Sequence, residues 1–241
     1  MSRFAAIVLA AGKGSRMNSD VHKQYMNLAG KPVIYYSLKA FSDSPVDEIV
    51  LVTGAGEQEY CRRELIEKYH FTKITHIVEG GAERYHSVYQ GLMVCTNAEY
   101  VMIHDGARPF VTQKIICKAM EDAPRSRANI VAVPAKDTIK MTDEKNWVTD
   151  TPRRDLLWSV QTPQTFETKL LRNAYKAMMK QKDKDITDDA MVVERYGGHR
   201  VHVIMGDYRN IKITTPEDLL IGEIFASEKN GNKKMVDMNW H

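Results

Sequence analysis

Short apolar runs rich in valine and isoleucine recur along the chain and predict buried strands. The apolar residues within each run are nearly continuous, without the polar alternation of a sheet that faces water. This pattern indicates strands covered on both faces, as in a parallel sheet. The predicted strands are Phe4–Ala10, Glu48–Thr53, Lys73–Val78, Tyr100–His104 and Asn129–Val133.

Helix-like segments separate these runs. In one of them Val88, Leu92 and Cys95 share a helical face, which is typical of core packing. Alternation of strands and helices on this scale predicts an α/β fold with a doubly wound, mostly parallel, Rossmann-like sheet. The predicted helices are Pro32–Phe41, Glu57–Tyr69, Glu83–Cys95 and Thr112–Asp122.

The segment 137–150 departs from this pattern and predicts a β-hairpin. Thr138–Met141 and Asn146–Thr149 flank the turn-like stretch Thr142–Lys145. The segment is too polar to lie in the main core, so we expect a projecting arm that runs to about residue 160.

Two later helices begin at capping signals. Thr187–Asp189 supplies a cap and two acids in a first turn, and Thr215–Asp218 supplies an N-cap, a proline and then an acid. Residues 227–241 are rich in lysine and asparagine and are predicted to be a frayed tail. We find neither a repeat nor a linker, so residues 1–241 are predicted to form one domain with an arm.

The composition and net charge exclude several classes of protein and of binding partner. The 241 residues are 43% hydrophobic and 27% charged, which is ordinary for a folded protein and excludes disordered and collagen-like classes. The 34 basic and 31 acidic residues give a net charge of +3. That balance is too even for a nucleic-acid partner, but it leaves room for a basic pocket that binds an anionic small molecule.

Cysteine usage and hydropathy predict a cytoplasmic protein. Cys61, Cys95 and Cys117 are odd in number and widely spaced, as ordinary thiols of a reducing compartment are. Apolar runs stay well short of the roughly 18 residues of a membrane span, so we expect no membrane partner. A weak signal peptide would resemble the first run, but a single basic residue, Arg3, precedes it and Gly12–Arg16 follows at once.

The first strand leads into LAAGKGSRM at 9–17, where small residues let backbone N–H groups approach a phosphate chain. Lys13, Arg16 and, farther on, Lys23 add positive charge. The spacing matches neither a Walker A loop, since Gly14 follows Lys13, nor a dinucleotide fingerprint, since position 17 is Met17. The alternative interpretation of the loop is a tight glycine turn, and the alternative interpretation of Lys23 is a solvated surface lysine.

Two further motifs follow predicted strands, where α/β sheets bind ligands. In EGGAER at 79–84 the backbone can contact a base edge, the alternative being a turn with Glu83 and Arg84 in solvent. In HDGARP at 104–109, Asp105 is placed to hold Mg²⁺ and Arg108 to bind a phosphate, the alternative being an aspartate that caps the turn. His104 lacks a second ligand at metal spacing and is predicted to be packed or hydrogen-bonded.

Further basic residues in the second half of the chain are candidates for binding an anionic ligand. Lys136, Lys140, Arg153 and Arg154 are typical of a solvated face, whereas Lys212 lies in an apolar, strand-like pattern directly before a capped helix. A phosphate-binding loop, several cations and one metal-binding carboxylate together favour nucleotidyl transfer over hydride or acyl transfer.

These motifs resemble the 2-C-methyl-D-erythritol 4-phosphate cytidylyltransferase family, which uses CTP in non-mevalonate isoprenoid precursor biosynthesis. The resemblance implies a nucleotidyltransferase sheet, Mg²⁺ as cofactor and a homodimer. The matching segments are AAGKGSRM (10–17), KQ (23–24), GGAERYHSV (80–88), HDGARP (104–109), KDTIK (136–140), RRDLLWSVQTPQ (153–164), TDDA (187–190) and GDYRNIKITTPEDL (206–219).

Carried over by position, the resemblance implies a role for each matching residue. Arg16 and Lys23 would stabilise the charge that grows at the α-phosphorus, and Asp105 would hold Mg²⁺ and substrate. Where the family commonly has an acid this chain has Ala82, which leaves backbone recognition there. The implied CTP-binding residues are Ala10, Ala11, Gly12, Gly14, Ser15, Gly80, Gly81, Ala82, Ser87 and Gly106. The implied contacts of methylerythritol phosphate are Asp105, Arg108, Thr138, Arg154 and the catalytic Lys212.

In that family the hairpin arm is exchanged across a homodimer, so Thr138 and Arg154 would serve the neighbouring subunit. The substrate's phosphate would attack the α-phosphorus of CTP in line and expel pyrophosphate. A phosphate monoester has a second pKa near 6 and is largely dianionic at neutral pH, so the reaction requires no general base.

Two alternatives remain. Ribitol-5-phosphate cytidylyltransferases share most motifs but tend to carry AGG and HDxVRP, where this chain has Ala10-Ala11-Gly12 and Ala107. A non-catalytic nucleotide-binding regulator could use the same fold. Arg16, Lys23, Asp105 and Lys212 together argue against it, because binding alone would not require all four.

Overall fold

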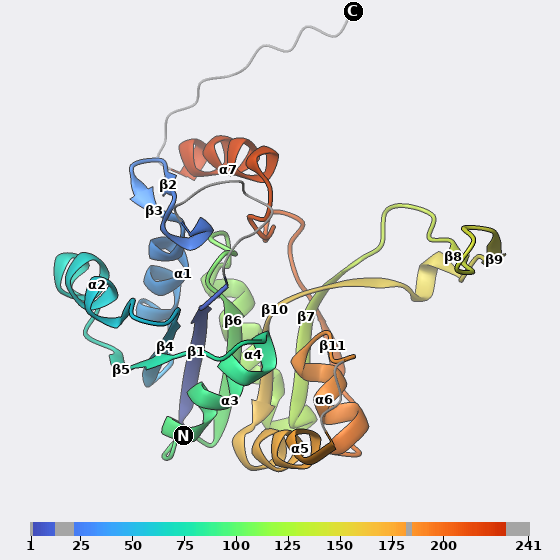
Figure 1. Cartoon of the computed structure of the whole chain (residues 1–241), viewed down its shortest axis with the longest axis horizontal. Coiled ribbons are helices and arrows are strands. Elements are labelled where there is room, and N and C mark those ends of the chain that lie inside the picture. Colours follow the sequence, from blue (N-terminus) through green and yellow to red (C-terminus); the bar gives the residue numbers. More distant parts are fainter. Residues whose placement is uncertain (1, 13–21, 182–184, 230–241) are drawn as a thin grey trace, which may run out of the picture.

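A seven-stranded sheet organises the part of the chain that the computed structural model describes, residues 2–12, 22–181 and 185–229 (Figure 1). The strand order is β11-β7-β10-β6-β1-β4-β5. β10 runs antiparallel to both its neighbours, and every other pair is parallel. The strands are β1 (Phe4–Ala10), β4 (Glu48–Thr53), β5 (Ile74–Glu79), β6 (Tyr100–Asp105), β7 (Ala128–Pro134), β10 (Trp158–Glu167) and β11 (His202–Met205).

The predicted doubly wound, mostly parallel sheet is confirmed. β1 and β4 have the predicted bounds, β6 differs from prediction by one residue at its end, and β5 and β7 differ by one residue at both ends. The sequence pattern missed β10 and β11. In β10 the buried positions include Gln161, Thr162, Gln164 and Thr165, so burial there is not marked by apolar residues.

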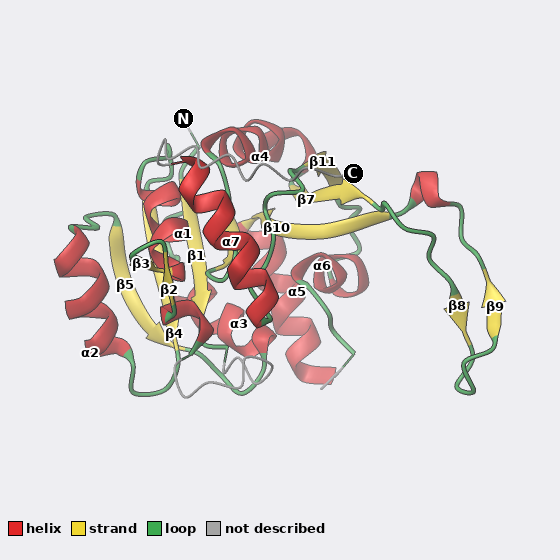
Figure 2. Ribbon diagram, turned by 90° about the horizontal axis from the view of Figure 1, so that it is seen from above, coloured by secondary structure: helices red, strands yellow, loops and turns green. Residues whose placement is uncertain are grey.

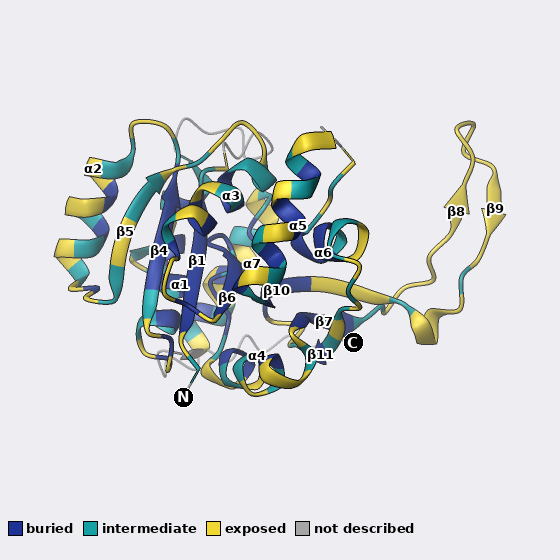
Figure 3. Ribbon diagram, turned by 90° about the horizontal axis from the view of Figure 1, so that it is seen from below, coloured by how far each residue is buried: buried dark blue, intermediate teal, exposed yellow. Residues whose placement is uncertain are grey.

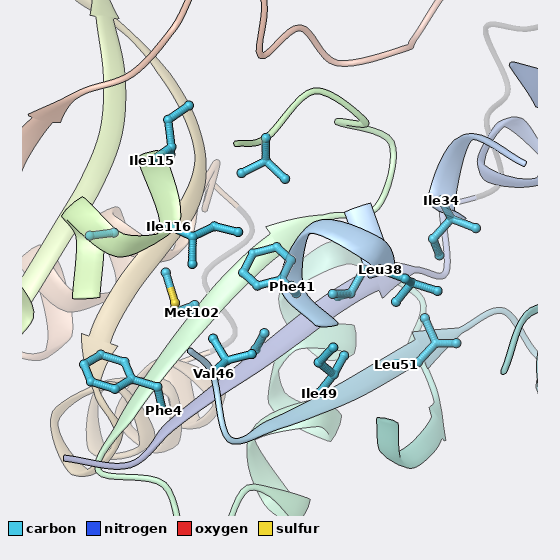
Figure 4. Packing of buried hydrophobic residues seen from close by; sticks show 14 of the residues in the cluster. Phe4, Ile34, Leu38, Phe41, Val46, Ile49, Leu51, Met102, Ile115 and Ile116 are labelled. Atoms are coloured by element: carbon cyan, nitrogen blue, oxygen red, sulfur yellow. The ribbon is translucent and has the colours of Figure 1, made fainter. Parts of the chain in front are cut away.

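Alternate residues of each central strand enter two hydrophobic cores, one on each face of the sheet. Phe4, Ala6 and Val8 of β1 pack with helices α1 and α4 and with the segment α2–η3, and Figure 4 shows Phe41 among these side chains. Ala5 and Ile7 point to the other face, which α3, α5 and α6 cover. The helices are α1 (Val33–Ser42), α2 (Gln58–Cys61), η3 (Arg62–Glu67), α3 (Arg84–Val94), α4 (Gln113–Ser126), α5 (Thr168–Gln181) and α6 (Asp189–Tyr196).

A third, smaller core lies under α7 (Pro216–Lys229). Leu28, from the short ribbon of β2 (Asn27–Leu28) and β3 (Lys31–Pro32), packs there with Phe110, Ile213 and Ala226. The strand-like pattern around Lys212 forms no strand: the segment 210–214 is extended chain, tied to the β6 loop because the Ile213 N–H donates to the Ala107 carbonyl at 2.8 Å. Its apolar residues are buried by α7 and not by a sheet.

The hairpin arm is confirmed. β8 (Met141–Thr142) and β9 (Val148–Asp150) pair antiparallel and stand clear of the sheet in Figures 1 and 2. Its paired strands are shorter than predicted. Nearly all its residues are exposed, as the colouring of Figure 3 shows.

The late helix starts need one correction. α6 begins at Asp189 with Asp188 as its N-cap, because the Asp188 carboxylate and not the Thr187 hydroxyl accepts from the Met191 N–H. α7 begins as predicted, with Thr215 and Asp218 bonded to each other's N–H groups.

α7 extends to Lys229, so residues 227–229 are helical and not part of a frayed tail, whose remainder lies outside the described residues. Within the described segments, no helix has the length and apolarity needed to cross a bilayer.

Candidate active site

A cavity of about 380 Å³ opens at the carboxyl ends of β1 and β6. The first loop forms one wall and the segment after β5 another, which brings together backbone that lies some 70 residues apart in the chain. The predicted residues that line it are Ala10, Ala11, Gly12, Lys23, Gly81, Ala82, Ser87, Asp105 and Lys212. Gly14, Ser15 and Arg16 lie outside the described residues, as does Lys13.

Two predicted nucleotide-binding glycines are packed behind this lining. A Cβ on Gly80 would lie 2.5 Å from the Ala11 Cβ and 2.6 Å from the Ser87 Oγ. A Cβ on Gly106 would lie 2.8 Å from the Leu9 carbonyl oxygen, to which the Gly106 N–H donates at 2.9 Å. These glycines therefore let the walls of the cavity approach each other closely.

Asp105 ends β6 and is the charged centre of the site. Its Oδ2 lies 2.8 Å from the Lys212 Nζ, and its Oδ1 lies 3.3 Å from the Arg84 Nε. Arg108 Nε lies 3.9 Å from Oδ2. Burial would raise the pKa of Asp105, but these three cations outweigh it and hold that pKa well below its usual value. The carboxylate is therefore ionised at neutral pH.

Arg84 is a site residue that the sequence analysis missed, having left it in a solvated turn beside Glu83. Glu83 is exposed, but Arg84 Nη2 lies 2.7 Å from Oδ2 of the fully buried Asp189. The other oxygen of Asp189 accepts from the Tyr175 hydroxyl at 2.5 Å. The sequence signals for Arg84 were its position after two glycines and its place in the segment GGAERYHSV that resembles the family, whereas its partner lies 105 residues farther along the chain.

A second cavity of about 300 Å³ adjoins the first and shares Arg84, Asp105 and Lys212 with it. Arg108 lines it too, and its Nη1 donates to the Asn210 carbonyl at 2.8 Å. Arg84, Arg108 and Lys212 face Asp105 and Asp189, and Asp188 also lines the second cavity, so the numbers of cations and carboxylates are equal. The two guanidinium groups and the ammonium are the groups there that can bind a phosphate.

His104 is hydrogen-bonded and buried, as predicted. Its Nδ1 lies 3.0 Å from the Thr162 hydroxyl and its Nε2 lies 3.2 Å from the Arg108 carbonyl. Burial lowers the pKa of His104 to about 4, so the imidazole is neutral near pH 7. It supports the backbone around Asp105 and adds no charge.

The metal prediction depends on one carboxylate. The described residues contain no cluster of three or more metal-ligating side chains. Mg²⁺ prefers one or two carboxylates together with substrate phosphates and water, and the ionised Asp105 lines both cavities. The donor set fits a metal ion that arrives with the nucleotide and shares the carboxylate with Arg84 and Lys212.

Thr138 and Arg154 line neither cavity. Both are exposed on the arm, where Arg154 donates to the Lys136 carbonyl at 3.3 Å. The two cavities of this chain are therefore formed without Thr138 and Arg154.

Comparisons with known proteins all point to one family. A family model described as 2-C-methyl-D-erythritol 4-phosphate cytidylyltransferase matches residues 4–228. A relative of that name from Clostridium novyi is 50% identical over 92% of this chain and 96% of its own length. Another from Lachnoclostridium phytofermentans is 46% identical over 95% of this chain and 98% of its own length.

Solved structures agree with the sequence comparisons. A 4-diphosphocytidyl-2C-methyl-D-erythritol synthase from Anaerococcus prevotii superposes with a TM-score of 0.83 at 32% identity, covering 94% of this chain and 96% of that one. The Francisella tularensis 2-C-methyl-D-erythritol 4-phosphate cytidylyltransferase gives 0.77 at 32% identity, covering 92% and 99%. The match to the family model thus spans the sheet, the described residues that line both cavities, and the arm.

The buried Arg84–Asp189 pair should stabilise the fold. Asp189→Asn keeps the shape and the Tyr175 bond but removes the charge that faces Arg84, so we expect a loss of about 2 kcal/mol in the free energy of unfolding. Urea unfolding monitored by circular dichroism measures it. The exposed pair of Lys39 and Asp43 is the control, and Asp43→Asn should cost less than about 1 kcal/mol. Equal, small losses in both variants would contradict the prediction.

Proposed function

This chain belongs to the 2-C-methyl-D-erythritol 4-phosphate cytidylyltransferase family, and on that premise we propose how its two adjoining cavities transfer the cytidylyl group of CTP to that substrate. The products are 4-(cytidine 5'-diphospho)-2-C-methyl-D-erythritol and pyrophosphate, in non-mevalonate isoprenoid precursor synthesis. The observation that carries the proposal is that both cavities meet at Asp105 and Lys212. A bound nucleotide and a bound phosphate monoester would therefore face each other across charged groups.

CTP occupies the first cavity in this proposal. The N–H groups of the stretch Ala10–Gly12, followed by Gly14 and Ser15, contact the triphosphate, as small residues allow. The backbone of Gly81 and Ala82 contacts cytosine, and the Ser87 hydroxyl contacts the nucleoside. Lys23 completes the wall beside the phosphates.

The methylerythritol phosphate occupies the second cavity. Arg108 and Lys212 bind its phosphate, while Asp105 accepts hydrogen bonds from its hydroxyl groups. Because Lys212 borders both cavities, it draws the attacking phosphate oxygen toward the α-phosphorus. Positioning of this kind replaces chemical activation of the nucleophile.

Catalysis is then electrostatic. The attacking phosphate is already largely dianionic, and its oxygen displaces pyrophosphate in line at the α-phosphorus. Lys23 and Arg16 stabilise the negative charge that accumulates in the transition state. Asp105 would hold Mg²⁺, which neutralises part of the triphosphate charge when bound.

The arm completes the site of a second copy of the chain. It exposes several large apolar side chains, a pattern that marks an interaction surface. Exchange of arms in a homodimer would cover these side chains and carry Thr138 and Arg154 to the partner's second cavity. The residues are Trp147 (73% exposed), Leu156 (68%), Val148 (58%) and Met141 (54%).

The cysteines bear on where the reaction takes place. All three are free thiols, and Cys61 and Cys95 are buried. Unpaired thiols persist in a reducing compartment, so a cytoplasmic location stays our prediction.

The first test is pyrophosphate release from CTP and Mg²⁺, with methylerythritol 4-phosphate and ribitol 5-phosphate in parallel. We expect release with methylerythritol 4-phosphate, loss of it on chelation with EDTA, and recovery when Mg²⁺ is restored. Release with ribitol 5-phosphate alone would overturn the substrate assignment. Binding of CTP without release from either substrate would favour the regulator.

Removal of the Lys23 ammonium should lower turnover with little effect on CTP affinity. We expect Lys23→Ala to reduce kcat by roughly a hundredfold or more, because the lost interaction acts on the transition state. Lys118→Ala, an exposed lysine on α4, is the matched control. A wild-type kcat for Lys23→Ala would refute the assignment.

Arm exchange predicts complementation between two inactive variants. Lys23→Ala disables a subunit's own site, and Arg154→Ala disables its partner's. After subunit exchange of an equal mixture, half of the dimers are mixed and each has one intact site, so about a quarter of wild-type activity should return. If the mixture stays inactive while size-exclusion chromatography shows mixed dimers, Arg154 serves its own subunit and the exchange proposal is wrong.

A further inference from the structure

The Glu57 carboxylate, just before α2, is the centre of a polar cluster outside both cavities. Its Oε2 accepts from the Tyr25 hydroxyl at 2.7 Å and from the Gly54 N–H at 2.9 Å, and its Oε1 lies 2.5 Å from the His22 Nδ1. Burial raises the pKa of Tyr25 well above its usual value, so the hydroxyl remains a donor. The carboxylate thus joins three residues of two separate segments.

Two of these residues flank Lys23. The short helix η2 (Lys23–Tyr25) follows His22. Glu57 therefore contacts the residue immediately before the lysine, His22, and the residue two positions after it, Tyr25. Gln24, between them, donates through Nε2 to the Ala10 carbonyl at the end of β1. Because Ala10 pairs in register with Thr53 at the end of β4, both attachments lie at the same sheet edge.

Gly54 leaves the space that the carboxylate occupies. A Cβ at this position would lie 2.8 Å from both the Cδ and the Oε2 of Glu57. Tyr25 is also closely packed. Its ring lies edge-on to the ring of Tyr60 with 5.1 Å between the ring centres, and its hydroxyl oxygen lies 3.1 Å from the Cys61 sulfur. The turn that bears Lys23 therefore contacts the Glu57 carboxylate as well as Tyr60 and Cys61 of α2.

We propose that Glu57 and Tyr25 are positioning residues for catalysis, which hold η2 so that the Lys23 ammonium faces the reacting phosphate. This inference rests on the proposed role of Lys23. Electrostatic stabilisation of a transition state depends on a donor fixed in place before reaction, and a small displacement lowers the rate steeply. We call the contacts of Glu57 with His22, Tyr25 and Gly54 the brace. In the proposed function CTP is bound largely by backbone groups of other segments, so its binding depends less on this brace.

Three variants loosen the brace in different ways. Glu57→Ala removes it, Tyr25→Phe removes one hydroxyl and keeps the ring, and Gly54→Ala displaces the carboxylate without removing its charge. We expect kcat to fall about tenfold in Glu57→Ala and threefold or more in the other two, with KM for CTP changed less than about threefold. Glu57→Gln, which can still accept from Tyr25 and Gly54, should recover most of the rate.

The matched control is Glu59→Ala. Glu59 is an acid in the first turn of α2, two residues after Glu57, whose side chain is 72% exposed and pairs with Arg62 at the surface. It should keep wild-type kcat and KM. Thermal unfolding of each variant, monitored by circular dichroism, identifies any that fail to fold, and Tyr25→Phe decides the matter if Glu57→Ala is among them.

The double variant separates a positioning role from a general one. If Glu57 acts through Lys23, then Glu57→Ala should cause less than a twofold further loss of kcat in a Lys23→Ala background, against about tenfold in the wild type. Equal losses in both backgrounds would overturn the inference, as would wild-type kcat in folded Glu57→Ala and Tyr25→Phe. Wild-type kcat in Lys23→Ala would instead refute the proposed function of Lys23.

Discussion

The ion pairs of Asp105 are the interaction on which the rest of this site depends. One carboxylate at the end of β6 contacts Arg84 from α3 and Lys212 from the segment before α7, with Arg108 nearby. These partners come from different parts of the molecule, so the carboxylate connects the α3 face of the sheet to the small core under α7. The Nη2 of Arg84 pairs in turn with the carboxylate of the buried Asp189. The cavity walls are thereby held together by charge as well as by apolar packing.

The topology of the sheet explains why these groups meet. Parallel strands end at the same edge, and β1, β4 and β6 deliver the first loop, Gly54 and Asp105 to it. The antiparallel β10 passes the same edge from the opposite direction and contributes Thr162, whose hydroxyl accepts from the Asp105 N–H at 3.1 Å. Crevices at the carboxyl ends of strands are where α/β sheets bind ligands.

This arrangement suits chemistry in which the nucleophile is already charged. A phosphate dianion and a triphosphate repel each other, so a site that joins them needs cations on both sides of the reacting atom and rigid walls. Lys23 and Lys212 supply charge from two walls of the first cavity. The exposed apolar arm is the surface through which we propose that a second copy of the chain completes this site.

The sequence by itself determined the sheet strands with continuous apolar runs, the arm and the segments that line the first cavity. Each of these is a local signal: β1 and β4 are read from neighbouring residues, and the glycine-rich segments from their spacing. The partners of each charge were decided only by the tertiary structure. Arg84 and Asp189 are separated by 105 residues and Tyr25 and Glu57 by 32, so no local pattern links them. β10 escaped prediction because polar residues fill its buried positions, and Lys212 proved to lie in extended chain because α7, not a sheet, buries its neighbours. Periodicity reports which residues are buried, whereas only the folded topology determines what each buried charge meets.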